Sequence, residues 1–413
     1  MYDLIVIGGG AAGYFAAIQA AESSPRPLRA VILEAGSQPL RKVRISGGGR
    51  CNVTHAEFDP AELVTHYPRG PRELRGPFSK FAPGDTMAFF ENRGVPLKIE
   101  DDGRIFPVSD DSASIVDALQ RAAREHRIEV RTKTPVTSLT PAPPHDGQWL
   151  VGLRDGSRLP AKRVVLATGS VGGGYRLAAS LGLDLVDRVP SLFSFNVAQS
   201  DLHDLRGLSV PDGHVRLEGL SVRTRGPILI THWGLSGPAV LRASAEGAVG
   251  LHALDYRTDF RVSWTPTDDA DEMLAYLEHA RREAGGRTLR FDVGLPLPRR
   301  LWRYLAARAG CREDWRWADL TAEQLHSLAG TLTADRYRMA GQTRFKEEFV
   351  TAGGIDLREV DFTRFALRRF DGLYAAGEVL DIDGVTGGFN FQAAWTGGSL
   401  IGRAVAEALA EEG

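Results

Sequence analysis

Residues 2–13 read Tyr2-Asp3-Leu4-Ile5-Val6-Ile7-Gly8-Gly9-Gly10-Ala11-Ala12-Gly13, and this stretch decides the fold. The apolar run that ends at Ile7 is typical of a buried parallel strand, because such a strand is covered on both faces. Gly8, Gly10 and Gly13 then form the pattern G-x-G-x-x-G. The pattern predicts a tight turn, a close approach of a pyrophosphate to the backbone, and close packing of a helix on the strand. The stretch therefore predicts a dinucleotide-binding loop.

The residues that follow complete this nucleotide-binding unit. Apolar residues between Tyr14 and Ala21 predict a helix, whose N-terminus offers free amides and the positive end of its dipole to phosphate. Residues 30–33 predict a second strand, which ends at Glu34 and Ala35. An acidic side chain about 20 residues beyond the loop is placed to accept hydrogen bonds from ribose hydroxyls.

Length and composition narrow the class of protein. A chain of 413 residues can bury a large core and predicts two or three domains. The formal net charge of -2 argues against a nucleic-acid or membrane-surface binder that is held by charge. The two cysteines, Cys51 and Cys311, are too few for a disulfide framework, an iron–sulfur cluster or a metal site. No apolar run approaches the roughly 20 residues that span a bilayer, and no charged leader precedes the first strand, so we expect a cytoplasmic protein.

A second glycine-rich stretch reads Ser46-Gly47-Gly48-Gly49-Arg50-Cys51-Asn52. Three consecutive glycines are costly inside a helix or strand, so the stretch predicts a loop. Amides in such a loop are suited to face an anion or a flat ring, with Lys42 and Arg50 as counter-charges. A flexible surface loop with solvated basic residues is the alternative, but the position directly after a nucleotide fold favours a site.

The middle of the chain predicts further elements of the same domain. We expect helices at 84–92 and 112–126 and a strand at 128–132. Residues 136–140, 148–154 and 162–168 predict three strands in succession, the last of which ends at Ala167-Thr168-Gly169. The crossover to this last strand is therefore a three-stranded β-meander in place of a helix. The glycine-rich residues 169–174 lack a following acidic strand end, so a second nucleotide loop is not expected there.

From Pro190 the pattern changes to short strands with regular turns. Residues 192–197, 215–217, 220–224, 227–231 and 260–264 predict a small antiparallel barrel or sandwich. Residues 269–283, 299–309 and 321–329 predict helices inserted into it, the last with a capping box of Thr321 and Gln324 and a stop at Gly330. The Arg/Trp-rich piece around Trp302 and Trp317 has two interpretations, stacking on nucleic acid or packing of a helical core, and we expect the core.

The last part of the chain returns to the first domain. Residues 343–351 predict a strand, and residues 372–376 predict a buried strand that runs into Gly377-Glu378. Glycines at 384, 387 and 388 precede a helix expected from about 392 to 411. These glycines again place backbone and a helix N-terminus against something flat or anionic.

In this combination the chain resembles flavoproteins of the two-dinucleotide-binding-domain type. The strand ends Ala167-Thr168-Gly169 and Gly377-Glu378 carry this first resemblance. More narrowly, the chain is similar to the bacterial HI0933-like family of YhiN-like, BaiN-type and aminoacetone-oxidase-like proteins. The narrower resemblance spans nearly the whole chain and is carried by four stretches: residues 45–52, 231–238, 350–355 and 377–392. Ser170 and His55 depart from the residues that related proteins often carry.

The resemblance implies non-covalently bound FAD and an α/β fold with an FAD-binding, Rossmann-like domain, a β-meander crossover, an inserted β-barrel domain and a small helical subdomain. It implies a discontinuous FAD domain of residues 1–189 and 343–413, a barrel of 190–268 and 331–342, and a helical subdomain of 269–330. The expected cofactor-binding residues are Gly8, Gly10, Ala11, Ala12, Gly13, Glu34, Ala35, Lys42, Gly48, Gly49, Arg50, Cys51, Asn52, Val136, Ala167, Thr168, Gly169, Gly377, Glu378, Gly388, Phe389, Asn390, Phe391 and Gln392.

The expected function is FAD-dependent oxidoreduction, with two-electron hydride chemistry on a small-molecule substrate. NAD(P)H, docking transiently over the flavin, or oxygen is the expected electron partner, and neither nucleic acid nor a membrane is an expected partner. No catalytic acid or base is assigned; His232, Cys51 and Asn390 are candidates only. Two alternatives remain, an RNA-modifying or RNA-binding flavoprotein and a non-catalytic flavin-binding sensor or assembly protein. The sequence carries no indication of the oligomeric state.

Overall fold

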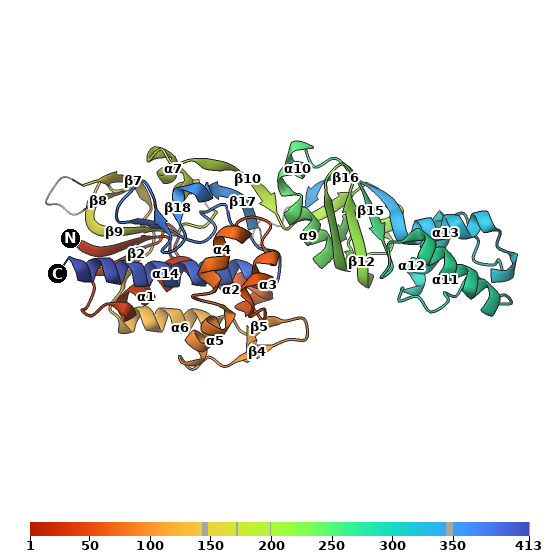
Figure 1. The fold of residues 1–413 in the computed structure, drawn as a ribbon, viewed down its shortest axis with the longest axis horizontal. Coiled ribbons are helices and arrows are strands. Elements are labelled where there is room, and N and C mark those ends of the chain that lie inside the picture. Colours follow the sequence, from red (N-terminus) through yellow and green to blue (C-terminus); the bar gives the residue numbers. More distant parts are fainter. Residues whose placement is uncertain (143–147, 171, 199, 344–349, 413) are drawn as a thin grey trace. The chain divides into compact units, whose positions relative to one another are not determined.

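The chain folds into two units in the computed structural model (Figure 1). The structure describes residues 1–142, 148–170, 172–198, 200–343 and 350–412. The first unit consists of Met1–Val189 and Val350–Gly413, and the second of Pro190–Phe349. The first unit is therefore discontinuous in sequence, and each unit has a hydrophobic core of its own.

The first unit is built on a sheet whose central strands are parallel. They are β1 (Tyr2–Ile7), β2 (Ala30–Leu33), β6 (Glu129–Arg131), β9 (Arg158–Leu166) and β20 (Leu373–Ala375), in the spatial order β6-β2-β1-β9-β20. Antiparallel β19 (Ala366–Leu367) and β18 (Val360–Asp361) extend the edge beyond β20. Val6 at the centre pairs with both Ile32 and Val165, and all three are fully buried. The short apolar runs thus form central parallel strands, as the sequence predicts.

The predicted meander is confirmed. Strands β7 (Val136–Pro141), β8 (Trp149–Leu153) and β9 follow one another as antiparallel neighbours. Strand β9 is long enough to belong to both layers, since Ala161 pairs with Trp149 of β8 and with Tyr2 of β1. The crossover between the parallel strands β6 and β9 is therefore made by strands, not by a helix.

Two helices from opposite ends of the chain lie side by side in the first unit (Figure 1). They are α1 (Ala11–Ser23) and α14 (Phe389–Glu411). Glycines on α14 allow the close approach: a Cβ added at Gly398 would lie 2.9 Å from the Ala12 carbonyl oxygen, and one at Gly402 would lie 2.5 Å from the Gln19 Cβ. The amphipathic helix α6 (Ala113–Glu125) also contacts α1.

Smaller elements complete the first unit. These are α2 (Arg41–Ile45), α3 (Pro60–Leu63), α4 (Pro71–Phe78), α5 (Pro83–Glu91), α7 (Gly172–Ser180), the sheet of β3 (Thr54–His55), β5 (Arg104–Pro107) and β4 (Leu97–Ile99), and the pair β10 (Leu185–Ser191) and β17 (Val350–Ile355). The sequence predicts α5 but not α2, α3 or α4, which are short and rich in proline or basic residues.

The second unit contains a closed barrel. Its strands are, in spatial order, β11 (Ser194–Val197), β14 (Gly234–Ser236), β13 (Val222–Ile230), β12 (Ser209–Leu217), β15 (Asp259–Ser263) and β16 (Asp335–Thr343). Its helices are α8 (Ser200–His203), α9 (Pro238–Glu246), α10 (Ala248–Ala253), α11 (Ala270–Glu283), α12 (Arg299–Arg308) and α13 (Ala322–Ala334). One continuous core joins the barrel strands to helices α11, α12 and α13.

Two predicted boundaries in this region are wrong, and one strand is not predicted. Strand β13 is continuous through Gly226 and Pro227, where the sequence predicts two strands. Helix α13 passes through Gly330 and ends at Ala334, because buried Leu328 and Leu332 continue its core face and packing outweighs the cost of one glycine. Strand β16 follows directly, in the stretch 331–342 that the resemblance assigns to the barrel but for which no strand is predicted. Of the predicted strand 343–351, residues 344–349 lie outside the described residues.

The predicted capping box at the start of α13 is present. The Thr321 amide donates to Gln324 Oε1 at 2.9 Å, and the Gln324 amide donates to Thr321 Oγ1 at 3.2 Å. Among the residues that the structure describes, no helix is long and apolar enough to cross a membrane.

Candidate functional site

The glycines of the first loop have the geometry that their predicted roles require. Gly8 follows β1 with φ +112°, and an added Cβ would lie 2.3 Å from the Ala167 carbonyl oxygen. A Cβ at Gly13 would lie 2.1 Å from the Gly8 carbonyl oxygen, so this glycine sets the distance between α1 and β1. Gly10 caps α1, and a Cβ there would meet no atom within 4 Å. Of the three glycines in this pattern, Gly10 alone borders open space, at the N-terminus of a helix, where a phosphate binds favourably.

Glu34 lies at the end of β2 and holds the loop. Its two carboxylate oxygens accept hydrogen bonds from the amides of Gly9 at 2.8 Å and Gly36 at 2.7 Å. The sequence places this carboxylate for ribose hydroxyls, but it does not predict these bonds to the neighbouring loops. Val136 begins β7 in the same neighbourhood, since the Thr134 amide donates to the Glu34 carbonyl at 2.9 Å.

The triple-glycine stretch forms a tight left-handed turn after α2. Gly47, Gly48 and Gly49 have φ values of +57°, +68° and +88°, and Cys51 follows at +61°. Added Cβ atoms at Gly48 and Gly49 would meet nothing within 4 Å, so their backbone is open to a ligand. Asn52 Oδ1 is buried, and no residue of the described ranges donates a hydrogen bond to it. A buried acceptor beside open glycine backbone suits a ligand with N–H groups.

Both predicted counter-charges already have acidic partners. Lys42 Nζ forms an ion pair with Glu378 and lies 3.2 Å from Ser170 Oγ. Arg50 forms ion pairs with Glu100 and Asp110, and its guanidinium lies 3.9 Å from the centroid of the Phe106 ring. Lys42 therefore links two predicted site segments, whereas Arg50 links the triple-glycine stretch to residues 100–110.

The predicted C-terminal site segment packs closely against the rest of the first unit. Gly388 has φ +95° and caps α14, and an added Cβ there would lie 2.6 Å from the Thr54 carbonyl carbon. The Gln392 side chain is fully buried and accepts hydrogen bonds from Thr54 Oγ1 at 2.6 Å and Thr86 Oγ1 at 2.9 Å. Asn390 exchanges two hydrogen bonds with the Gly384 backbone. The side chains of Asn390 and Gln392 thus hold the protein together.

The described site residues meet at one edge of the parallel sheet. Gly8 follows β1, Glu34 follows β2, Ala167 to Gly169 follow β9, and Gly377 with Glu378 follow β20. Because parallel strands end at the same edge, these segments converge there, as in open α/β sheets that bind nucleotides. A Cβ at Gly377 would lie 3.3 Å from the Ala12 Cβ, and one at Gly169 would lie 3.8 Å from Glu378 Oε2.

The three catalytic candidates gain little from the structure. Burial raises the pKa of the Cys51 thiol to about 12, so this thiol is protonated at neutral pH and a thiolate contact is disfavoured. Asn390 is used structurally, as described above. His232 belongs to the second unit and packs edge-on against Trp233, with 4.0 Å between the ring centroids.

Sequence reasoning missed a cluster of polar and aromatic residues near the start of α14. Arg69 and the fully buried Asp383 form a bidentate ion pair. Tyr67 donates its hydroxyl to the Phe389 carbonyl at 2.6 Å, and the rings of His55 and His66 stack on Phe389. These pairs join residues more than 300 positions apart, so no local pattern indicates them.

The parallel sheet, the glycine loop at its switch point and the open glycine backbone beside Asn52 define an FAD-binding flavoprotein, and these residues fit the dinucleotide. The chain matches the family model described as the HI0933-like protein Rossmann domain over residues 2–404. It belongs to this family, and it is an FAD-dependent oxidoreductase.

Two curated relatives align over nearly the whole chain. The chain is 31% identical to the 3-dehydro-bile acid delta(4,6)-reductase of Clostridium scindens, covering 97% of this chain and 98% of the relative. It is 30% identical to the ribosomal RNA dihydrouridine synthase of Escherichia coli, covering 96% of each. A solved structure of the 3-ketosteroid-delta4-(5alpha)-dehydrogenase from Rhodococcus jostii RHA1 has a TM-score of 0.51 at 16% identity and covers 98% of this chain and 96% of its own, which supports the fold.

Proposed function

We propose that the chain catalyses the FAD-dependent reduction of a carbon–carbon double bond conjugated to a carbonyl group, with NAD(P)H as the electron donor. The observation that carries this proposal is the full-length similarity to two relatives whose names describe one chemical change. A delta(4,6)-reductase of a 3-dehydro compound saturates double bonds conjugated to a 3-oxo group. Dihydrouridine differs from uridine by a saturated C5–C6 bond next to the C4 carbonyl.

The reaction balances with one NAD(P)H and one proton from water for each double bond that is reduced. NAD(P)H gives up a hydride and becomes NAD(P)⁺, while the substrate gains the equivalent of that hydride at the β carbon and a proton at the α carbon. FAD supplies the two-electron chemistry at its N5 atom. The protein supplies binding, orientation and exclusion of water.

We assign the binding of FAD to the residues that converge at the sheet edge. The Gly8–Gly13 loop and the N-terminus of α1 are suited to the pyrophosphate, and Glu34 to the ribose. Gly48, Gly49 and Asn52 are suited to the flavin ring, because they combine open backbone with a buried acceptor. Glu378, which Lys42 holds, and the backbone at Gly388 are suited to the ribityl side.

The candidate reactions differ in their substrate and in the direction of electron flow. A small-molecule enone is the first candidate substrate, and uridine within RNA is the second, which the name of the Escherichia coli relative favours. Oxygen as the acceptor, with an amine or another reduced substrate, is the competing interpretation of the electron flow. A non-catalytic flavin-binding protein would show no turnover at all.

The test is anaerobic spectroscopy of the purified protein. We expect a yellow protein whose flavin absorbance is bleached by NADPH or NADH and restored by a conjugated enone or by a uridine-containing RNA. A saturated ketone is the matched control and should not restore the colour. If neither the enone nor the RNA restores it but oxygen does, the protein is an oxidase and the proposal is wrong. A folded, colourless protein that does not take up FAD would overturn the cofactor assignment itself.

A further inference from the structure

The charge of the chain is distributed unevenly. Residues 287–316 contain eight arginines, no lysine and three acidic residues, which gives this segment a formal charge of +5. Since the whole chain carries -2, the remaining residues carry -7. The overall charge, from which the sequence predicts no nucleic-acid partner, therefore conceals a strongly basic segment.

The contacts within this segment connect its arginines into one surface. Arg287 and Arg299 both lie over the ring of Phe291, at 5.9 and 5.6 Å from its centroid. Phe291 is 39% exposed, so an aromatic face lies between two cations at the surface.

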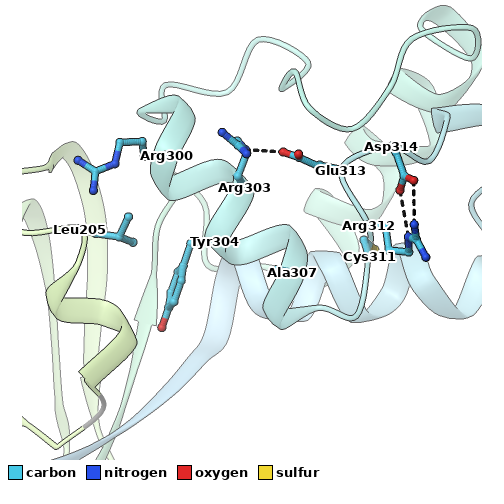
Figure 2. Close-up of a pocket in the computed structure, with 9 residues that line it drawn as sticks. All are labelled: Leu205, Arg300, Arg303, Tyr304, Ala307, Cys311, Arg312, Glu313 and Asp314. Atoms are coloured by element: carbon cyan, nitrogen blue, oxygen red, sulfur yellow. Dashed lines mark hydrogen bonds and ion pairs between the residues drawn. The ribbon is translucent and has the colours of Figure 1, made fainter.

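Glu313 joins two further arginines, at 2.6 Å from Arg303 and 3.7 Å from Arg290. Arg303 also lines a groove of about 710 Å³ with Arg300 and Arg312 (Figure 2). The remaining residues that line the groove are Leu205, Tyr304, Ala307, Cys311, Glu313 and Asp314. Figure 2 shows that Arg300, Arg303, Tyr304 and Ala307 come from α12, with Arg303 paired to Glu313 and Arg312 to Asp314. We call Arg287, Arg290, Phe291, Arg299, Arg300, Arg303 and Arg312 the arginine face.

Several cations of the arginine face are not neutralised. Among the described residues, Arg287, Arg299 and Arg300 have no carboxylate partner, and Arg300 donates to the Asp204 carbonyl instead. The side chains of Arg303 and Arg312 are 51% and 69% exposed. Ion pairs between side chains as exposed as these contribute little to stability, so a phosphate can replace the carboxylate partner at little cost.

The tryptophans of this segment have a different role. Trp302 and Trp317 are fully buried, and their rings stack with 5.9 Å between the centroids. The core interpretation of these tryptophans is therefore confirmed. The aromatic ring that the surface offers to a ligand is Phe291.

We propose that the arginine face binds RNA, with phosphates on the guanidinium groups and an unstacked base on Phe291. A guanidinium group can form bidentate hydrogen bonds with two oxygens of one phosphate. An aromatic ring beside cations is typical of sites that bind single-stranded nucleic acid. An anionic membrane fits less well, because stable insertion needs more apolar area than one exposed phenylalanine supplies. The inference rests on the proposed function in one respect, since it names RNA as the molecule that carries the reduced double bond.

The experiment measures binding of the FAD-loaded protein to a fluorescein-labelled stem-loop RNA by fluorescence anisotropy over a range of potassium chloride concentrations. The triple variant R287Q/R299Q/R300Q removes the cations without an acidic partner. We expect the affinity of this variant for the RNA to fall at least tenfold. The slope of the logarithm of the binding constant against the logarithm of the salt concentration should decrease in magnitude by about 2, which is about 0.7 for each of three lost phosphate contacts. F291A is expected to weaken binding about fivefold or more through loss of stacking.

The control is R257Q/R336Q/R338Q, which removes three exposed arginines elsewhere on the second unit and should bind as the wild type does. The proposal is overturned if the wild type does not bind the RNA, if the control loses affinity as the triple variant does, or if phosphatidylserine vesicles compete fully for the face. Bleaching by NADPH and recovery with an enone are recorded on the same proteins. Loss of these alone refutes the proposed function and leaves the RNA surface standing.

Discussion

Two glycines of the first loop should respond in opposite ways to the same substitution. In Gly10→Ala the new methyl group meets no protein atom within 4 Å, and the backbone φ of -90° suits alanine. We therefore expect an apoprotein of unchanged or slightly higher stability, by about 0.4–1 kcal/mol from the lower entropy of the unfolded chain. The methyl group nevertheless occupies the space where a pyrophosphate approaches the backbone. The affinity for FAD should fall at least tenfold, which is about 1.4 kcal/mol.

Gly13→Ala should destabilise the fold itself. Its Cβ would lie 2.1 Å from the Gly8 carbonyl oxygen and 3.0 Å from Val6 Cγ1, so α1 must move away from β1. Overpacking of this kind costs about 1–3 kcal/mol, and more where backbone must shift. The free energy of unfolding of the apoprotein should fall by that amount, and FAD binding should weaken as a consequence.

The assay combines urea unfolding of the apoproteins with titration of FAD, followed by quenching of its fluorescence. Gly84→Ala in α5 is the control, since its Cβ also meets nothing within 4 Å and it lies outside the loop. If Gly10→Ala binds FAD as the wild type does, the pyrophosphate does not pass over Gly10. If Gly13→Ala is as stable as the control, the close approach of α1 to β1 does not limit the fold.

Four further changes test the site and the two cores. Glu34→Gln replaces a carboxylate oxygen that accepts a hydrogen bond from a loop amide. Hydrogen bonds to a charged group contribute about 1.5–3 kcal/mol, so FAD binding should weaken at least tenfold in the same titration. Gly402→Ala forces α14 away from α1, where its Cβ would lie 2.6 Å from a backbone nitrogen, and should lower the free energy of unfolding by about 1–3 kcal/mol in urea. Burial raises the pKa of the Cys51 thiol from 9.0 to about 12. The protonated thiol therefore contributes fully to the free energy of unfolding below pH 9, and this contribution is lost as the pH rises towards 12. In urea titrations over this pH range, the free energy of unfolding should fall less steeply for Cys51→Ala than for the wild type. Arg308→Met leaves the buried Asp335 carboxylate without its ion pair and should lower the free energy of unfolding by about 3 kcal/mol. The double variant Arg308→Met/Asp335→Asn should recover part of this loss. Equal losses in the single and the double variant would show that the ion pair does not stabilise the fold.

The parts of the fold that the sequence predicts are those with strong local patterns. The buried runs of β1, β2 and β9 and the periodic helix α6 carry their pattern within a few residues. Strand β16 also carries one, since Arg336 and Arg338 are exposed while Tyr337 and Met339 are buried. This strand is nevertheless not predicted. The preceding helix is expected to end at Gly330, but the packing of α13 continues it to Ala334.

The site divides in a similar way. Glycine loops can be predicted because a positive φ or a close backbone approach restricts the residue type, as at Gly8 and Gly388. The roles of Gln392 and Asp383 cannot, because each depends on partners about 300 positions away that share no periodic pattern with it. The sequence beside a glycine loop does not distinguish a polar side chain that binds a ligand from one that accepts a hydrogen bond from a buried threonine.

The nucleotide fold in this chain is completed only by its last residues, and this affects how a loss of FAD is interpreted. Strand β20 pairs with β9, and the glycines of α14 bring that helix against α1, which carries the Gly8–Gly13 loop at its N-terminus. A defect in residues 350–412 therefore disturbs α1 as directly as a defect in the loop does. Loss of FAD identifies a residue as a ligand-binding residue only when the unfolding of the apoprotein is unchanged. Gly10 borders open space and meets that condition by its geometry, whereas Gly13 and Gly402 do not.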